Sequence, residues 1–366
     1  MPMSKIDYSK AFFELKAFLE GCANNPESQK EHLSGAGAVF QFEKQLTQYY
    51  GKSFALTFSS ATTAMQALCL AYGLKGTEIL TSPFNWGGSI TPFILHNNKI
   101  RFAGFEPDSL SLCADDLSRT VTTKTNAVVS VDYHGFPADS MRIKEFCQER
   151  GLIYISDSAQ SLGAFRDGKP AGYFSDVVVL SFSPGKSLYA GEGGAIVTDD
   201  ELLYERLLQI AHHPSRQKMV TGLSGYSEFT PLNGRINPLA AILLNKSFLA
   251  SLTQLRKKQG AWFKELTSLH NAGFIHLPAD LRALNSSTFF HSVFRLKEPS
   301  TISDVEEYRS CSGIQKTAST PTLIPIPVNR IFIRHFKRKY SCSDSLKIQL
   351  RSFDSSRYVD FGKILT

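Results

Sequence analysis

Apolar and polar positions along the first 245 residues predict repeated strand and helix units. Short apolar runs rich in β-branched residues, typical of buried strands, occur at residues 53–58, 78–82, 99–105, 127–132, 152–156 and 176–182. Apolar residues at helical spacing lie between or beside these runs, at residues 39–50, 140–150 and 200–211. Strands that alternate with helices indicate an α/β fold whose mostly parallel sheet has helices on both faces.

The two ends of the chain follow a different pattern. Residues 8–19 predict an amphipathic helix that leads into the first repeated unit. Beyond about residue 245, amphipathic segments, beginning with a helix at 240–255, surround a single strand at 287–296. We therefore expect a large domain over 1–245, with 1–33 as its lead-in, and a smaller α+β domain over 246–366.

The composition is that of a globular chain, since 42% of the 366 residues are hydrophobic. The net charge of +7 favours acidic ligands such as phosphorylated or nucleotide-linked small molecules, although nucleic acid or an anionic surface fits equally well. The six cysteines form no C-x-x-C pair and no zinc-type cluster, which indicates reduced thiols, a cytoplasmic location and no metal site. Neither a signal peptide nor a membrane span is expected.

Lys186 is the candidate catalytic residue. It lies in the stretch SFSPGKSLYAGEGG, after a predicted strand and before a cluster of glycines. The carboxyl end of a strand is where ligands bind in open α/β sheets. Small uncharged neighbours help an amine to lose its proton, as a nucleophile or Schiff-base lysine must. On position alone, a solvated surface lysine is the commoner interpretation.

Asp157 directly follows the predicted strand at 152–156. A carboxylate in this position is costly to bury unless it meets a cation or a strong donor. A bond to a neighbouring loop or a helix-capping role explains it equally well. Because Asp157 precedes Lys186 by about the length of one strand-to-strand unit, both side chains can reach one cleft.

Two further segments offer contacts to a ligand. Ala61 and Thr62 begin a predicted helix, whose unpaired N–H groups and dipole suit a phosphate, although an ordinary Ser/Thr cap is more frequent. Trp86 precedes two glycines and can lie flat over a planar ligand, or it is a core or lid residue. Together with the lysine and the aspartate, these features meet the demands of pyridoxal 5′-phosphate.

Residues 39–244 resemble the DegT/DnrJ/StrS-type sugar aminotransferases, which are fold type I pyridoxal phosphate enzymes. The block SFSPGKSLYAGEGG implies that Lys186 forms the Schiff base and that Ser181 binds the cofactor phosphate. The block DSAQSLGA implies that Asp157 pairs with the pyridine nitrogen and that Gln160 lies near the ring hydroxyl.

Three shorter segments extend the resemblance. SSATTAM is similar to the phosphate-binding turn, with the backbone amides of Ala61 and Thr62 as donors. Trp86 takes the position of the aromatic residue that stacks on the ring. LNGRI is similar to an Asn-x-Arg element, which implies that Asn233 reaches the phosphate of the neighbouring subunit in a homodimer.

The resemblance implies transfer of an amino group from an amino acid, glutamate or glutamine, to a keto sugar, most often nucleotide-linked. An aminotransferase for a cyclitol or another small carbonyl compound is a rival. Another is elimination at the α-carbon, but relatives that dehydrate sugars replace the lysine with histidine, and Lys186 is retained. The third is a non-catalytic regulator that binds nucleic acid through the basic run at 330–340. The lysine, the aspartate and the phosphate turn together disfavour it.

Overall fold

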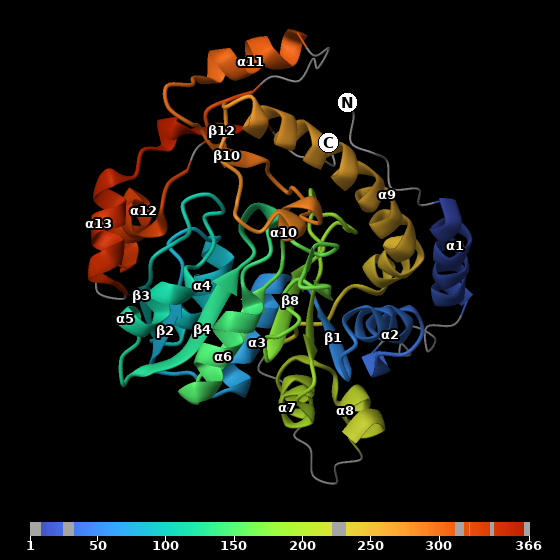
Figure 1. Ribbon diagram of the computed structural model, residues 1–366. Coiled ribbons are helices and arrows are strands. Elements are labelled where there is room, and N and C mark those ends of the chain that lie inside the picture. The colour runs from blue at the N-terminus through green and yellow to red at the C-terminus, as the bar shows by residue number, and fades with distance from the viewer. Residues whose placement is uncertain are drawn as a thin grey trace.

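A twisted sheet of eight strands forms the centre of the computed structural model (Figure 1), which describes residues 9–24, 33–221, 232–311, 318–321, 323–336 and 340–361. In spatial order the strands are β1 (Phe54–Phe58), β9 (Gly194–Thr198), β8 (Val177–Ser181), β5 (Ile153–Asp157), β4 (Thr125–Val131), β2 (Glu78–Thr81), β3 (Lys99–Phe102) and β11 (Tyr340–Cys342). Only β9 runs antiparallel to its neighbours. The predicted α/β fold with a mostly parallel sheet is confirmed.

The strands are nearly continuous apolar runs because helices cover both faces of the sheet. In β8, Val177 and Val179 face one core, while Val178 and Leu180 face the other. The first core is shared with α3 (Ala61–Ala71), α4 (Gly87–Leu95) and α7 (Glu201–Ala211). The opposite face is covered by α2 (Ala38–Tyr50), α6 (Ser140–Glu149) and α9 (Pro238–Asn271). Short additional elements are α5 (Leu117–Thr120), α8 (Pro214–Thr221), β6 (Phe165–Arg166) and β7 (Lys169–Pro170).

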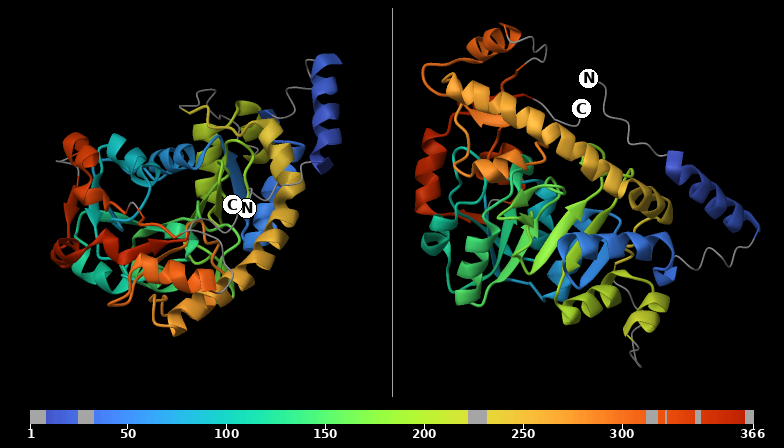
Figure 2. Two further views of the ribbon diagram at one scale, coloured as in Figure 1. Left: turned by 90° about the horizontal axis from the view of Figure 1, so that it is seen from above. Right: turned by 45° about the vertical axis from the view of Figure 1, so that its right-hand side comes forward.

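The helix α9 connects the sheet to the C-terminal part of the chain (Figure 2). It has 34 residues and extends well past the helix predicted at 240–255. The lead-in helix α1 (Ser9–Asn24) packs against it. Within the described residues, no helix is long and apolar enough to cross a membrane.

A separate apolar core forms around the second half of α9, from residues such as Trp262, Phe294 and Val359. It includes a two-stranded antiparallel sheet of β10 (Val293–Arg295) and β12 (Tyr358–Asp360), together with α10 (Leu281–Asn285) and α11 (Ile302–Cys311). The strand predicted at 287–296 therefore forms over three residues only. Since α9 passes through residue 245, the domain division at that residue stays a prediction.

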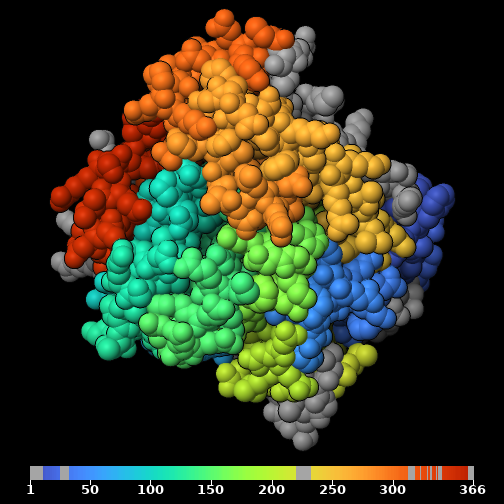
Figure 3. All heavy atoms as spheres, in the orientation of Figure 1, coloured from blue at the N-terminus to red at the C-terminus, as the bar shows by residue number. Residues whose placement is uncertain are grey.

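The last part of the chain returns to the sheet. Helices α12 (Arg330–Phe336) and α13 (Asp344–Ser352) flank β11, which pairs parallel with the edge strand β3. The rings of Phe332 and Phe336 pack against the main core, and Phe332 lies 6.2 Å from Phe102. These aromatic residues of the basic run thus face inward, while residues 337–339 lie outside the described ranges. In Figure 3 the orange residues lie at the top of the molecule and the red residues lie on its left side.

Candidate active site

Lys186 and Asp157 lie together at the carboxyl end of the sheet. Asp157 is the last residue of β5 and is 6% exposed. Lys186 follows β8, the neighbouring strand, in a turn closed by a bond from its backbone N–H to the carbonyl of Ser183 (3.3 Å). Burial raises the pKa of the Asp157 carboxyl group, and the charge of Lys186 opposes this rise. Its Nζ atom lies 4.3 Å from the centroid of the Phe290 ring.

The carboxyl group of Asp157 is buried but has specific partners. Burial is the largest influence and raises its pKa above the ordinary range. The Ser89 hydroxyl donates to Oδ2 at 2.5 Å and the backbone N–H of Ala159 donates to Oδ1 at 3.1 Å, and both contacts favour the ionised form. A buried carboxylate of this kind suits a cationic ligand atom, such as a protonated ring nitrogen.

Gly194 brings Ser181 next to the start of α3. It is the register partner of Ser181 in β8 and of Phe58 in β1. A Cβ atom on Gly194 would lie 2.4 Å from the backbone nitrogen of Ala61, so only glycine allows this approach. The two predicted phosphate-binding segments are therefore adjacent.

The N-terminus of α3 has the character of an anion site. Ser60 caps it, since its hydroxyl accepts from the backbone N–H of Thr63 at 3.1 Å. Ser60 therefore provides the ordinary Ser/Thr helix cap that the sequence offered as the alternative to a phosphate site. The next N–H groups, those of Ala61 and Thr62, have no carbonyl partner within the helix, and the Thr62 side chain is exposed.

Trp86 and Asn233 both border this helix start. Trp86 precedes α4 and is 74% exposed. A Cβ atom on Gly88 would lie 2.6 Å from Thr62 Oγ1 and 3.1 Å from Trp86 Cδ1. The side chains of Thr62 and Trp86 therefore both pack closely against Gly88. Asn233 is also exposed, and the carbonyl of Gly234 beside it accepts from the backbone N–H of Ser59 at 2.7 Å.

Gln160 lies in the same loop as Asp157. Its Oε1 accepts from the backbone N–H of His134 at 2.8 Å. Asp132, at the end of β4, anchors the loop because its Oδ2 accepts from the hydroxyls of Ser158 (2.7 Å) and Ser161 (2.6 Å). Burial raises the pKa of Asp132 to about 6.

Three residues of the site were not predicted from the sequence: Ser89, Asp132 and Phe290. Asp132 had a detectable signal, because it ends a predicted strand in the same way as Asp157. Ser89 and Phe290 had none, since each approaches the site only through packing between distant segments.

The site fits pyridoxal phosphate. A lysine amine and a buried carboxylate lie together, and a helix start suited to a phosphate lies across Gly194 from Ser181. The fold and these residues therefore define the class as an α/β enzyme of the pyridoxal phosphate-dependent type.

The sequence matches the model of the DegT/DnrJ/EryC1/StrS aminotransferase family over residues 26–315. The chain belongs to this family. The match includes all eight residues for which the sequence predicted a role in the site, whose individual roles stay predictions.

Known proteins with similar sequences include two enzymes named for nucleotide-linked sugars. The chain is 26% identical to GDP-perosamine synthase of Vibrio cholerae over 252 residues, 69% of this chain and 66% of that protein. It is 28% identical to UDP-2-acetamido-2-deoxy-3-oxo-D-glucuronate aminotransferase of Pseudomonas aeruginosa over 333 residues, 89% and 88% of the two chains.

The fold is similar to that of Escherichia coli GDP-4-keto-6-deoxy-D-mannose-3-dehydratase with bound hydrated pyridoxal phosphate. The TM-score is 0.72 at 20% identity, and the similarity covers 90% of this chain and 88% of that one. At this identity the likeness shows the fold alone.

Proposed function

We propose that the protein is a pyridoxal phosphate-dependent aminotransferase that moves an amino group from an amino acid to a keto sugar carrying a nucleotide. The observation that carries this proposal is the placement of Lys186 beside the buried Asp157, at the ends of neighbouring strands. Family membership supports the reaction type. The names of the two relatives and the net charge of +7 support an anionic, nucleotide-linked acceptor.

The residues of the site divide the work of binding the cofactor. Ser181 and the backbone N–H groups of Ala61 and Thr62 would bind the phosphate. Trp86 would lie against the ring and Gln160 near its hydroxyl group.

Amino transfer needs one residue that moves a proton to and from carbon and a second residue that keeps the ring nitrogen of the cofactor protonated. Pyridoxal phosphate, when bound, supplies a carbonyl carbon for the amino group and a ring that accepts the electron pair of the α-carbon. Lys186 would carry the proton from the α-carbon of the donor, and in the second half would return one to the carbon that receives the amino group. Asp157 would keep a proton on the ring nitrogen, because its carboxylate stabilises the cationic form.

A homodimer would complete the site. Trp86 and Asn233 are exposed side chains at the border of the helix start that would take the phosphate. We propose that Asn233 reaches the phosphate of the neighbouring subunit, so that two sites form across one interface.

The cysteines bear on the location of the protein. All six are free thiols, which supports a reducing, cytoplasmic location.

The proposal is tested by absorbance spectra of the protein with pyridoxal phosphate, recorded before and after glutamate is added. We expect a visible band that requires Lys186 and that glutamate converts to the spectrum of the aminated cofactor. Lys186→Ala with pyridoxal phosphate is the matched control. A band that is identical in Lys186→Ala contradicts the role of the lysine, and a wild-type band that glutamate and glutamine leave unchanged contradicts amino transfer from these donors.

The acceptor is tested in the second half-reaction. Protein in the aminated form is mixed with a 4-keto or 3-keto sugar linked to GDP or UDP, and separately with the same sugar without its nucleotide. We expect only the nucleotide-linked sugars to restore the original spectrum. Equal turnover without the nucleotide would instead favour a small carbonyl acceptor.

A further inference from the structure

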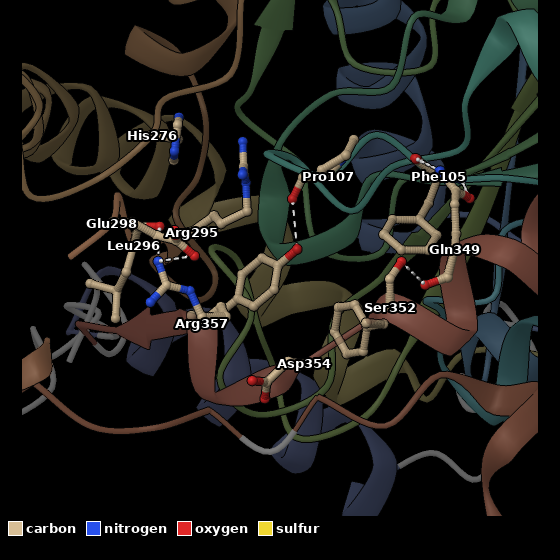
Figure 4. Close-up of a pocket in the computed structure, with 12 residues that line it drawn as sticks. Phe105, Pro107, His276, Arg295, Leu296, Glu298, Gln349, Ser352, Asp354 and Arg357 are labelled. Carbon is tan, nitrogen blue, oxygen red and sulfur yellow. Dashed lines mark hydrogen bonds and ion pairs between the residues drawn. The ribbon is translucent and has the colours of Figure 1, made fainter. Parts of the chain in front are cut away.

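A pocket of about 370 Å³ lies where the C-terminal part of the chain meets the loop that follows β3 (Figure 4). Its volume is at the lower end of the range typical of small-molecule sites. Six of the lining residues matter for its chemistry: Phe105, Arg295, Leu296, Phe353, Arg357 and Tyr358. None of the residues predicted to bind the cofactor lines it, so it is a separate site.

The floor of this pocket is aromatic and firmly held. Phe353 lies 5.5 Å from Tyr358 and 5.9 Å from Phe105, measured between ring centroids. The Tyr358 hydroxyl donates to the carbonyl of Pro107 at 3.0 Å. Gln349 bonds both backbone groups of Phe105, at 3.1 and 3.2 Å. A floor fixed in this way favours binding of a flat apolar body, because little order is lost on binding.

Two guanidinium groups lie at the rim. The side chains of Arg295 and Arg357 are 35% and 34% exposed. Among the described residues, Arg295 donates through Nε to Asp108 (2.8 Å), and Arg357 donates through Nη2 to the carbonyl of Leu296 (3.2 Å). Since a guanidinium group has five N–H donors, both can also bind a phosphate or a carboxylate.

Asp108 already forms an ion pair with Nε of Arg295, so a ligand would use the other N–H groups of that guanidinium, whereas Arg357 has only weak acidic competitors. Asp354 accepts from the backbone N–H and the hydroxyl of Ser356, at 2.9 and 2.7 Å. The Glu298 side chain is 86% exposed and lies 3.7 Å from Arg357, a geometry in which an ion pair contributes little. An incoming anion can therefore displace Glu298 from Arg357.

The floor is connected by ring contacts to the loop that carries Trp86. Phe84 lies 5.2 Å from Phe353 and 4.8 Å from Phe105 between centroids. Its neighbour Pro83 accepts at its carbonyl from the N–H of Ile326, at 2.9 Å. The C-terminal part thus holds this loop directly, and a ligand that moves Phe353 also moves the support of Phe84.

We propose that the pocket is a regulatory site for a small molecule that joins a planar ring to a phosphate or carboxylate group. The ring covers Phe353 and Tyr358, and the anionic group binds Arg295 and Arg357. Occupancy changes the position of the Trp86 loop through Phe353 and Phe84. Binding at this site does not depend on which carbonyl compound the enzyme aminates.

Binding is tested by calorimetry on the full chain with UMP, uridine and inorganic phosphate as probes. We expect UMP to bind about tenfold or more tightly than uridine or phosphate, because only UMP engages both floor and rim. Arg357→Gln should weaken UMP binding about tenfold, and Arg351→Gln, an exposed arginine of α13 outside the pocket lining, should leave it unchanged. UMP binding that survives Arg357→Gln undiminished, as binding near Lys186 would, overturns the proposal.

Coupling is tested by tryptophan fluorescence, since Trp86 and the buried Trp262 are the only two tryptophans of the chain. We expect UMP to change the emission with the same dissociation constant that calorimetry gives. Trp86→Phe should abolish this change while binding persists. Phe353→Leu, which keeps an apolar side chain but removes the ring contact, should reduce it. An emission change that survives in Trp86→Phe, or no change on saturation, overturns the coupling to the Trp86 loop.

Discussion

Replacement of Asp132 by asparagine should change how the stability of the protein depends on pH. Asp132 is 1% exposed, and burial raises its pKa from 3.8 to about 6 despite three hydrogen bonds to the ionised form, from Ser158, Ser161 and the backbone of Ala138. Between these two values the folded protein holds a proton that the unfolded chain has released. Stability therefore falls as the pH rises from about 4 to about 6.

The size of this effect follows from the two pKa values. They differ by about two units, and each unit corresponds to about 1.36 kcal/mol, so the free energy of unfolding falls by about 3 kcal/mol across the window. The asparagine side chain of the variant does not titrate, and its amide can donate to the serine hydroxyls. We expect the free energy of unfolding of Asp132→Asn to lack the fall that Asp132 causes between about pH 4 and pH 6. This expectation holds whatever the stability of the variant is at about pH 4.

The assay is urea unfolding of the cofactor-free wild type and variant at several pH values from about 4 to about 7. The predicted quantity is the difference between their free energies of unfolding, which should shift by about 3 kcal/mol in favour of the variant as the pH rises. Ser161→Ala removes the hydrogen bond that most favours ionised Asp132, so the pKa of Asp132 should rise further. The fall in the free energy of unfolding should then continue to higher pH than in the wild type. A difference between wild type and Asp132→Asn that is constant across this range would refute the reasoning.

Two further predictions concern the cofactor site. Ser89→Ala removes the 2.5 Å hydrogen bond to Asp157, a charge-assisted bond of about 1.5–3 kcal/mol, and should raise the pKa of that carboxyl group further. The acid limb of the pH profile of kcat/KM should move upward with it, and an unmoved limb would count against a role for ionised Asp157. Gly194→Ala places a Cβ atom 2.4 Å from the backbone nitrogen of Ala61 and should weaken pyridoxal phosphate binding about tenfold or more, measured by titration of the cofactor-free protein. The control is Gly260→Ala, where the added carbon has no atom within 4 Å apart from the adjoining residues and the backbone of its own helix, and an equal loss in both variants would contradict the argument.

The sheet and the two central residues of the site were accessible from the sequence because their signals are local. A buried strand shows itself as a short apolar run, and the polar residue that ends it marks the carboxyl edge of the sheet. Lys186 and Asp157 were predicted in this way, and the structure places both at that edge, while their roles stay predictions. The helix predicted at 39–50 forms over Ala38–Tyr50, so its start was predicted one residue late. Its end was predicted correctly because Gly51 adopts a φ of 62°, which ends the helix.

The C-terminal half was harder to predict because its contacts are nonlocal. The strand β11 has three residues and exists only through its pairing with β3, so its own sequence carries little signal. The strand expected at 287–296 is mostly loop, since packing against β12 extends over 293–295 alone. Phe290, which lies in that loop, reaches Lys186 from a segment more than a hundred residues away along the chain.

The central claim is that Lys186 holds the cofactor covalently and that Asp157 supports it. The most direct measurement is reduction of the protein with borohydride in the presence of pyridoxal phosphate, followed by proteolysis and mass spectrometry of the peptides. We expect one stoichiometric adduct, on the peptide that contains Lys186, and its absence from Lys186→Ala. Asp157→Asn should still form the adduct but lose most amino transfer. A stoichiometric adduct on a different lysine, or none in the wild type, would contradict this account of the site.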